Sequence, residues 1–430
     1  MKAVILAAGE GNRLRPITAS KPKPMIPLLG KPLLEHTIFG LKEAGIEQII
    51  LIVGYKEEII KNYFSSFYKD YKIEIEYITQ KEYFGTAHAT FQARNSIKDE
   101  PFLMMNGDLF VDTVMLKNLI QEYKKYQNES FITLLEVDNP ENYGVISLNS
   151  DGYVEKITEK PSPDSGLGNL ANAGIYIFDP LIFKAIKKTE KSMRDEYEIT
   201  DSIRIAINEL GLKMRGFILK NYYWNDIGLP WQLFEVNKYI LDNLESINKG
   251  IIEENVVIKG TVQIGKDTII KSGSYIQGPC YIGNNCLIGP NAFIRPYTSI
   301  NDNCHIGMSE IKNSLVFSDS AIPHFNYVGD SIICEGVNLG AGTKLSNLRF
   351  DNQTIKMNIN GIQIDSKLRK LGAILGPNSQ TGINASIMCG KIIGNDSIIG
   401  AHTIVNENIP PNSIYYLDSS GKVIKKTKNS

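Results

Sequence analysis

The sequence predicts an α/β domain followed by a parallel β-helix built from hexapeptide repeats. Three observations lead to this prediction. The length of 430 residues favours two or three domains at roughly 150 residues per domain. Apolar strands alternate with helix-like stretches over residues 1–228, which is typical of an α/β fold with a mostly parallel sheet. In the second half, aliphatic residues recur at every sixth position, a period that fits neither a helix nor an ordinary strand.

The elements of the first part follow from its apolar runs. Short runs bounded by polar residues are expected to be strands, and longer stretches with helical spacing are expected to be helices. The expected strands include Ala3–Ala7, Ile49–Val53, Phe102–Met105, Phe131–Val137 and Ile175–Phe178, and the expected helices include Leu33–Ala44 and Glu57–Phe67.

The second part carries nine consecutive isoleucines at a spacing of six. One aliphatic residue per repeat would point inward, and the turns between repeats would stack coil upon coil into a continuous core. The period slips between about residues 307 and 370 and then returns for six positions. The residues in phase are Ile258, Ile264, Ile270, Ile276, Ile282, Ile288, Ile294, Ile300 and Ile306, then Leu375, Thr381, Ile387, Ile393, Ile399 and Val405.

Two further segments complete the expected organisation. Pro230–Leu244 has helical spacing with a proline near its start, and we expect a linking helix that packs against one or both domains. The last residues, GKVIKKTKNS, are expected to be a solvated, disordered basic tail. The expected divisions are 1–228 for the α/β domain, 229–250 for the linking helix, 251–411 for the β-helix and 412–430 for the tail.

The composition excludes several classes of protein. Lys and Arg number 46 against 47 Asp and Glu, so the basic excess of a nucleic-acid-binding domain is missing. No apolar run approaches the roughly 18 residues that a membrane span needs. The N-terminus is charged by residue 10, which does not suit a secretion signal. Five cysteines without CxxC spacing indicate neither a disulfide framework nor a zinc site. We therefore expect a cytoplasmic protein without nucleic-acid or membrane partners.

A glycine-rich loop follows the first expected strand directly. Gly9 and Gly11 let the backbone approach a ligand closely, and the amides of such a loop suit phosphate oxygens. Arg13 and Arg15 add positive charge. The third glycine of the dinucleotide fingerprint is missing, because Leu14 stands there, and this lowers the odds of a classical NAD domain.

Eight segments of the first part, in order, resemble the sugar-1-phosphate nucleotidyltransferases. The resemblance covers nearly all of residues 1–228 and implies a Rossmann-like nucleotidyltransferase domain. Members of this family join a sugar 1-phosphate to a nucleoside triphosphate by attack on the α-phosphorus, with release of pyrophosphate. The segments are LAAGEGNRLRP (Leu6–Pro16), SKPKPMIPLLGKPLLEH (Ser20–His36), QKEYFGTAHA (Gln80–Ala89), NGD (Asn106–Asp108), YGVI (Tyr143–Ile146), EKP (Glu159–Pro161), NAGIY (Asn172–Tyr176) and WNDIG (Trp224–Gly228).

The resemblance gives each of these segments a role. Arg13 would hold the leaving pyrophosphate, and Lys23 would draw the attacking phosphate to the α-phosphate, so that charge neutralisation and positioning carry the catalysis. Asp108 and Asp226 would hold Mg²⁺ between the phosphates. His36 and His88 are expected to be packing or capping residues. The implied nucleotide-binding residues are Leu6, Ala8, Gly9, Gly11, Gln80, Gly85 and Thr86, and the implied sugar-phosphate-binding residues are Asp108, Tyr143, Gly144, Glu159 and Asn172.

The region where the period slips resembles the acetyltransferase half of the bifunctional enzymes that make UDP-N-acetylglucosamine. The matching segments are PHFNYVGD and VNLGAGT, preceded in order by FIRP and SEIK. The resemblance implies a left-handed β-helix in which His324 is the general base that takes a proton from the sugar amine, which then attacks acetyl-CoA. The residues implied to bind the acceptor or acetyl-CoA are Arg295, Lys312, Tyr327, Asn338, Ala341, Asn347 and Lys356.

After VNLGAGT the bacterial pattern ends, and NLRFDNQTIKMN looks closer to the archaeal bifunctional enzymes. Gln353 stands where another lysine is expected in that form, which leaves the preferred amino-sugar acceptor open. The coils near 372–405 would supply the pantetheine groove between subunits, and the resembling enzymes imply a homotrimer or a multiple of it.

Three functions remain after the sequence has been read. The favoured one is a bifunctional enzyme that uses acetyl-CoA to acetylate an amino-sugar 1-phosphate such as glucosamine 1-phosphate, and that transfers a uridylyl group to the sugar 1-phosphate with Mg²⁺. The alternative is a glucose-1-phosphate thymidylyltransferase or uridylyltransferase, using dTTP or UTP, whose β-helix serves only oligomerisation. The third is a non-enzymatic assembly or regulatory subunit. Arg13, Lys23, Asp108 and Asp226 argue against the third, and His324 with its neighbours separates the first two.

Overall fold

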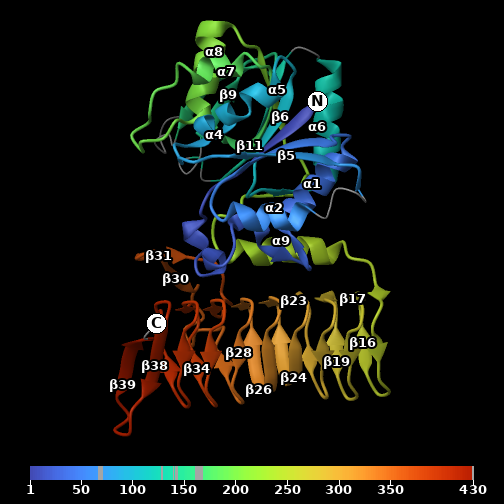
Figure 1. Cartoon of the computed structure of the whole chain (residues 1–430), viewed down its shortest axis with the longest axis vertical. Coiled ribbons are helices and arrows are strands. Elements are labelled where there is room, and N and C mark those ends of the chain that lie inside the picture. Colours follow the sequence, from blue (N-terminus) through green and yellow to red (C-terminus); the bar gives the residue numbers. More distant parts are fainter. Residues whose placement is uncertain (66–70, 127–128, 139, 141–143, 160–167, 429–430) are drawn as a thin grey trace. The chain divides into compact units, whose positions relative to one another are not determined.

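The computed structural model describes residues 1–65, 71–126, 129–138, 140, 144–159 and 168–428, and it separates into two compact units (Figure 1). The first unit contains Met1–Glu10, Pro22–Met25 and Leu33–Ile227, and the second contains Gly11–Lys21, Ile26–Pro32 and Gly228–Ser430. Two short segments that the sequence assigned to the first domain therefore cluster with the second unit. In the described residues, no helix is long and apolar enough to span a membrane.

The first unit is built on one sheet. Its described strands follow the order β10-β9-β11-β6-β1-β4-β5, and β8 pairs with both β11 and β12. These strands are β1 (Lys2–Ala7), β4 (Gln48–Val53), β5 (Glu74–Thr79), β6 (Phe102–Asn106), β8 (Ser130–Glu136), β9 (Gly144–Leu148), β10 (Val154–Glu159), β11 (Leu170–Phe178) and β12 (Met214–Ile218). A small ribbon of β7 (Phe110–Val111) and β13 (Trp224–Asn225) lies outside this sheet, as does the pair β2 (Pro27–Leu28) and β3 (Lys31–Pro32) of the second unit.

The sheet is parallel on one side and mainly antiparallel on the other, where β12 pairs in parallel with β8. β5, β4, β1 and β6 are all parallel, as the alternation of strands and helices predicts. β11 runs antiparallel to β6, β8 and β9, and β9 and β10 form a hairpin. The expectation of a mostly parallel sheet is therefore wrong for this side, because β9 and β10 are joined by a short turn without a crossover helix and β11 enters between β6 and β9 in the opposite direction.

Helices cover both faces of the sheet, because successive side chains of β1 point to opposite sides. Ala3 and Ile5 pack in one core with helices α1 and α6, whereas Val4 packs in a second core with α4, α7 and α8. The described helices of this unit are α1 (Leu33–Glu43), α2 (Glu57–Ser65), α4 (Thr86–Gln92), α5 (Arg94–Ile97), α6 (Thr113–Lys125), α7 (Ile182–Ile186) and α8 (Ile199–Leu210). Short 3-10 turns η1 (Asn12–Leu14), η2 (Ile17–Ala19) and η3 (Lys23–Met25) follow the first strand.

The second unit is a parallel β-helix whose strands lie side by side in Figure 1. Ile264 pairs with Ile282, and Ile270 pairs with Ile288, so each of these coils is three hexapeptides long. These isoleucines are almost fully buried and form one continuous core along the stack. The predicted period of six is therefore confirmed, with one inward aliphatic residue on each of three walls.

The second and third walls share two long strands, β24 and β26, whereas the first wall forms a separate sheet. The first wall contains β14 (Ile247–Asn248), β17 (Val262–Ile264), β20 (Cys280–Ile282), β23 (Thr298–Ile300), β25 (Leu315–Val316), β27 (Ile332–Ile333), β32 (Ile374–Leu375) and β35 (Ile392–Ile393). The second contains β15 (Ile251–Ile252), β18 (Ile269–Ile270), β21 (Leu287–Ile288), β24 (His305–Lys312), β26 (Ala321–Gly329), β28 (Asn338–Leu339), β33 (Gln380–Thr381) and β36 (Ile398–Ile399). The third contains β16 (Val257–Lys259), β19 (Tyr275–Gln277), β22 (Phe293–Ile294), β24, β26, β29 (Lys344–Leu345), β34 (Ser386–Ile387) and β37 (Ile404–Val405).

The slip of the period has two physical causes. Ile300 pairs with Val316, and Ile306 pairs with Ile322, so the coils in this region are shorter than three full hexapeptides. Farther on, Ile333 pairs with Leu375, well beyond the length of one coil, because an excursion containing β30 (Lys356–Ile359) and β31 (Ile362–Asp365) leaves the stack as an antiparallel hairpin. The inward aliphatic residues stay aligned in space although their spacing in the sequence changes.

Helix α9 (Gln232–Asp242) lies within the predicted linking segment and belongs to the second unit. The buried amide of Asn237 donates to the carbonyl oxygen of Tyr297 at 2.9 Å and accepts from the Ser299 hydroxyl at 2.5 Å. Leu241 packs in a small cluster with Tyr281 of the coils. The helix is thus attached to the β-helix by hydrogen bonds as well as by apolar contact.

The C-terminal segment is folded, so the prediction of a disordered tail is wrong for its described part. β38 (Ser413–Leu417) pairs in parallel with β36, and β39 (Val423–Thr427) returns antiparallel to β38. Tyr415 is 2% exposed and belongs to the β-helix core. The basic residues that suggested a tail lie on β39, where Lys425 pairs with Glu407 at 2.5 Å. The hairpin adds apolar contacts that the run of lysines in the sequence did not predict.

Candidate functional site

The predicted nucleotide loop lies at the carboxyl edge of the sheet. β1 and β6 are parallel neighbours, so the residues that follow them meet at one edge, where open α/β sheets bind ligands. Leu6 lies in β1, Ala8 is buried, and a side chain at Gly9 would meet open space. The Gly107 amide after β6 donates to the Leu6 carbonyl oxygen at 2.9 Å, and a Cβ on Gly107 would lie 2.7 Å from that oxygen. The two loops are therefore in direct contact.

Lys23 and Asp108 form an ion pair at this edge. The Lys23 ammonium is 2.6 Å from the Asp108 carboxylate, and the lysine is only 8% exposed. A lysine this buried is rarely found without a charged partner, because its desolvation must be offset. The structure thus brings the cation expected to bind the attacking phosphate into contact with a carboxylate expected to bind Mg²⁺.

Asp226 lies at the same end of the β7–β13 ribbon as Asp108. Asn225 of β13 pairs antiparallel with Phe110 of β7, so Asp226 lies after that pair and Asp108 lies before it. Two carboxylates with phosphate oxygens to complete the shell are the ligand set that Mg²⁺ prefers. Asp108 and Asp226 therefore have the donor chemistry that a magnesium ion would require.

Gly11 and Arg13 belong to the segment that clusters with the second unit. Gly11 has a φ of 65°, a left-handed conformation that glycine adopts without strain, and it precedes η1. Arg13 lies in η1 and is exposed. In the second unit, Lys21 of this segment pairs with Glu335 at 2.6 Å.

The predicted base-reading segment is held by hydrogen bonds. Gln80 is 4% exposed, and its amide nitrogen lies 2.9 Å from Nδ1 of His88. Gly85 has a φ of 96°, and a Cβ there would lie 2.7 Å from the Tyr197 carbonyl oxygen. The Thr86 hydroxyl accepts from the Ile199 amide at 3.0 Å. His88, expected to pack or cap, therefore orients Gln80, a role the sequence did not indicate.

The predicted sugar-side residues are partly described. Gly144 begins β9, and Asn172 lies in β11, where its amide donates to the Tyr176 hydroxyl at 2.6 Å and accepts from the Gly174 amide at 3.0 Å. Tyr143 and the side chain of Glu159 lie outside the described residues. Asn172 pairs with Leu134, and the neighbouring Ala171 pairs with Val145, so Asn172 and Gly144 lie on adjoining strands.

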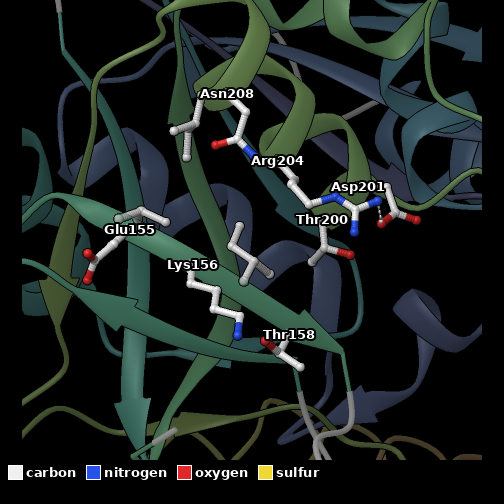
Figure 2. Close-up of a pocket in the computed structure, with 10 residues that line it drawn as sticks. Glu155, Lys156, Thr158, Thr200, Asp201, Arg204 and Asn208 are labelled. Carbon is white, nitrogen blue, oxygen red and sulfur yellow. Dashed lines mark ion pairs between the residues drawn. The ribbon is translucent and has the colours of Figure 1, made fainter.

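A cavity of about 420 Å³ lies between β10 and α8 (Figure 2). Lys156 and Thr158 line it from the strand, and the Arg204–Asp201 ion pair, at 3.0 Å, lies on the helix side. None of the predicted site residues is among the described residues that line it. It lies apart from the Lys23–Asp108 pair and is not part of the predicted site.

In the second unit, β24 and β26 carry three of the predicted acetyltransferase residues, Lys312, His324 and Tyr327. His324 lies on β26 opposite Met308 and is exposed, and Tyr327, farther along the same strand, lies opposite Glu310. A bulge between Met308 and Glu310 shifts the register. Exposure of the imidazole leaves it accessible to a substrate amine.

A hydrogen-bond network joins four polar residues beside this strand. The Asn347 amide donates to the Tyr327 hydroxyl at 3.1 Å and to the Asp330 carboxylate at 2.5 Å. The Lys312 ammonium is 3.3 Å from the same carboxylate. Burial raises the pKa of the Tyr327 phenol, the Asn347 hydrogen bond opposes this rise, and the nearby carboxylate of Asp330 adds to it. Tyr327 therefore stays protonated and able to donate at neutral pH.

Arg295 forms its own ion pair, 2.8 Å from the carboxylate of Glu310. Asn338 is exposed on β28, and its strand neighbour Ala321 begins β26. Ala341 follows β28, and the next amide, that of Gly342, donates to the His324 carbonyl oxygen at 2.8 Å. Lys356 lies exposed on the β30–β31 hairpin, where no described contact joins it to this network.

Glu310 and Asp330 are the residues that the sequence analysis did not single out. Each lies inside a matched segment, SEIK or PHFNYVGD, and each forms an ion pair with a predicted phosphate-binding cation. The signal available in the sequence was a carboxylate next to or near each expected basic residue, which is too common on protein surfaces to be selective.

Comparison with known proteins finds relatives of both parts of the chain. A family model described as nucleotidyl transferase matches residues 2–243, and one described as the GMPPB C-terminal domain matches residues 276–414. The bifunctional protein GlmU of Methanocaldococcus jannaschii is 43% identical over 417 residues, 97% of this chain and 97% of its own. The bifunctional sugar-1-phosphate nucleotidylyltransferase/acetyltransferase of Sulfurisphaera tokodaii is 44% identical over 414 residues, 95% of this chain and 98% of its own.

Among solved structures, a UDP-glucose pyrophosphorylase complexed with UDP-glucose aligns with a TM-score of 0.51 at 27% identity, covering 56% of this chain and 99% of its own. The match to the family model over more than half of the chain and the two near-full-length relatives point to one assignment. The chain belongs to the nucleotidyl transferase family and, along nearly its whole length, to its bifunctional nucleotidylyltransferase/acetyltransferase branch.

Proposed function

We propose that the protein acetylates glucosamine 1-phosphate with acetyl-CoA and then transfers a uridylyl group from UTP to the product, giving UDP-N-acetylglucosamine. The observation that carries this proposal is that one chain holds both the buried Lys23–Asp108 pair and the Tyr327–Asn347–Asp330–Lys312 network. A relative that matches 97% of the chain is named as a bifunctional protein. A β-helix that served only for assembly would not need a polar network beside an exposed histidine.

In the acetyl transfer, the amine nitrogen of the sugar attacks the thioester carbonyl carbon of acetyl-CoA. His324 accepts the proton that the nitrogen loses, the carbon–sulfur bond breaks, and the proton passes to the departing thiolate of CoA. A neutral imidazole has one ring nitrogen with a free lone pair, which can accept that proton. Arg295 and Lys312 supply the positive charge that the sugar phosphate requires.

In the uridylyl transfer, a phosphate oxygen of the sugar 1-phosphate attacks the α-phosphorus of UTP, and the bond to the bridging oxygen breaks to release pyrophosphate. Lys23 would exchange part of its pairing with Asp108 for the incoming phosphate, which lowers the repulsion between two anions. Asp108 and Asp226 would hold Mg²⁺, which neutralises developing charge on the phosphates when bound. Arg13 would bind the pyrophosphate.

The remaining substrate contacts and the assembly belong to the same proposal. Gln80, Gly85 and Thr86 would contact the uracil, and Gly144 and Asn172 would contact the sugar.

A homotrimer, with acetyl sites completed between subunits, would give a light-scattering mass three times that of one chain. A monomer at micromolar concentration would count against this arrangement.

The test is a matrix of substrates with two readouts, free CoA and pyrophosphate. UTP and dTTP are combined with glucosamine 1-phosphate, N-acetylglucosamine 1-phosphate and glucose 1-phosphate, with and without acetyl-CoA. We expect CoA release only with the amino sugar, and faster pyrophosphate release from UTP with the acetylated sugar. Pyrophosphate release without any CoA release from hexosamine 1-phosphates would reject the acetyltransferase and leave a nucleotidyltransferase alone.

A further inference from the structure

We propose that Asp330 is a positioning residue that sets the hydrogen-bond direction of Asn347 and Tyr327 and so determines which hydroxyl pattern the acetyl acceptor must present. The inference rests on the acetyl transfer proposed above and adds a residue that the motif roles did not include. Asp330 does not need to touch the substrate, because it acts through the two side chains that it orients.

The Asp330 carboxylate is buried, and both of its oxygens accept hydrogen bonds. The residue is 4% exposed, and its Oδ1 accepts from the Asn313 amide at 2.7 Å. Its Oδ2 accepts from the Asn347 amide at 2.5 Å and faces the Lys312 ammonium at 3.3 Å. A buried carboxylate is stable only when donors surround it, and here donors come from two different parts of the chain.

The direction of the network follows from the chemistry of these groups. An ionised carboxylate only accepts hydrogen bonds, so Asn347 must turn its NH₂ group, and not its carbonyl oxygen, toward Asp330. The same nitrogen donates to the Tyr327 oxygen at 3.1 Å. The Tyr327 hydroxyl hydrogen is then free to donate elsewhere, and the Asn347 carbonyl oxygen is directed away from Asp330.

The space around Gly329 provides independent evidence that the fold requires this arrangement. A Cβ on Gly329 would lie 2.6 Å from the Asn347 nitrogen and 2.6 Å from the Tyr327 oxygen. Any larger residue would therefore push the two groups apart or aside. Only glycine lets the amide and the phenol meet over the backbone between Tyr327 and Asp330.

As a consequence, the Tyr327 hydroxyl is always the donor and the Asn347 carbonyl oxygen is always the acceptor beside the exposed His324. A sugar hydroxyl can satisfy both groups, because it donates to the Asn347 oxygen and accepts from the Tyr327 hydroxyl. If Asp330 lost its charge, the Asn347 amide could rotate and exchange its oxygen and nitrogen. Sites that hydrogen-bond a substrate strongly reject ligands that leave a buried group unpaired.

The test compares Asp330→Asn with Asp319→Asn in the full-length protein. Asp319 also occupies a left-handed turn position, with a φ of 62°, and accepts from the Asn303 amide at 3.0 Å, but it is exposed and outside the network. For Asp330→Asn we expect the KM for glucosamine 1-phosphate to rise about tenfold or more, with the KM for acetyl-CoA and the rate of pyrophosphate release unchanged. For Asp319→Asn we expect all three to be unchanged.

A second set of variants keeps the test decisive if Asp330→Asn folds poorly. Asn347→Ser, at a half-buried position, removes the amide through which Asp330 acts and should give the same rise in KM. Tyr327→Phe combined with Asp330→Asn should be no worse than the poorer single variant, since Asp330 acts through the network that contains Tyr327. An unchanged KM in Asn347→Ser, or additive effects in the double variant, would overturn the inference. Absence of CoA release from the wild type would instead reject the acetyltransferase itself.

Discussion

At the scale of single residues, Arg215 shows how a half-buried charge is made stable. Its guanidinium donates to the Glu129 carboxylate at 2.9 Å and to the Tyr153 hydroxyl at 2.8 Å, and it lies 4.0 Å from the centre of the Tyr126 ring. Tyr153 completes the cluster by donating to Glu129 at 2.7 Å. The cluster ties β12 to the turn between β9 and β10, on the antiparallel side of the sheet.

Glu129→Gln should reveal this cluster through the pH dependence of stability. Burial alone would raise the pKa of the Glu129 carboxyl, but the hydrogen bonds from Tyr153 and Arg215 and the charge of Arg215 together lower it. A lowered pKa stabilises the folded state above the unfolded pKa of about 4.3, and this contribution is lost as the pH falls through the folded pKa. We expect the variant to lose about 1–2 kcal/mol of unfolding free energy at pH 7 and almost none once the pH is below the folded pKa of Glu129.

Urea unfolding at several pH values measures this difference. Glu122→Gln is the matched control, because Glu122 pairs with Lys125 on the surface of α6 at 2.7 Å. Its loss should stay below about 0.5 kcal/mol at all pH values. A pH-independent loss in Glu129→Gln would show that the carboxylate charge is not what stabilises the cluster.

Individual site residues could be named from the sequence, but their partners could not. The motifs placed Lys23 and Asp108 in one site, and the structure shows them 2.6 Å apart. The role of Asp330 was not indicated, because it depends on a turn that brings Asn347, from a later coil, onto one carboxylate. Contacts of this kind follow from the pairing of β26 with later coils and not from local spacing.

At the scale of elements, the C-terminal hairpin shows where a composition argument fails. The run of lysines in β39 predicted a solvated segment. β38 nevertheless has a buried face, which the period of six did not predict because the period ends before this strand begins. Tyr415 is buried in the β-helix core, and the next residue, Tyr416, is half-buried on the other side of the strand. By contrast, the predicted strands of the α/β domain agree with β1, β4 and β6 within one residue at either end, because their apolar runs are fully buried and sharply bounded.

Tyr415→Ala and Tyr416→Ala form a matched pair that tests this hairpin. Removing a fully buried aromatic side chain costs about 3–5 kcal/mol, and we expect the Tyr415 variant to lose that much while the Tyr416 variant loses less than half of it. The melting temperature measured by circular dichroism reports the difference. Equal and negligible effects would indicate that the hairpin does not pack on the last coil.

At the scale of the whole molecule, each proposed activity uses its own set of side chains. Asp108 belongs to the first unit, and His324 belongs to the second. The product of acetyl transfer is the acceptor of uridylyl transfer. A mutation can therefore stop one reaction alone, and the acetylated sugar can diffuse from one protein molecule to another that carries out the second reaction.

Mixing two inactive variants should restore the complete reaction. Asp108→Asn should lose pyrophosphate release by 100-fold or more, on the order of the loss of one group that stabilises transition-state charge, and keep CoA release. His324→Ala should lose CoA release by about 10²–10⁴-fold and keep pyrophosphate release from the acetylated sugar. We expect the mixture to convert glucosamine 1-phosphate, acetyl-CoA and UTP to the nucleotide sugar, measured by liquid chromatography. If neither the variants nor their mixture form it, the two activities depend on each other.

The excursion that carries β30 and β31 has a consequence for how such a protein can change. The chain leaves the first wall after Ile333 and re-enters it at Leu375, and the pairing on both sides is the same as between ordinary coils. The chain forms β28 and β29 of the other walls on the way, so the walls impose no length only on the segment after β29, which contributes Asn347 and Lys356. Insertions, deletions and substitutions there can alter acceptor recognition while the aliphatic stack is left intact, so specificity and stability in this half of the molecule can evolve separately.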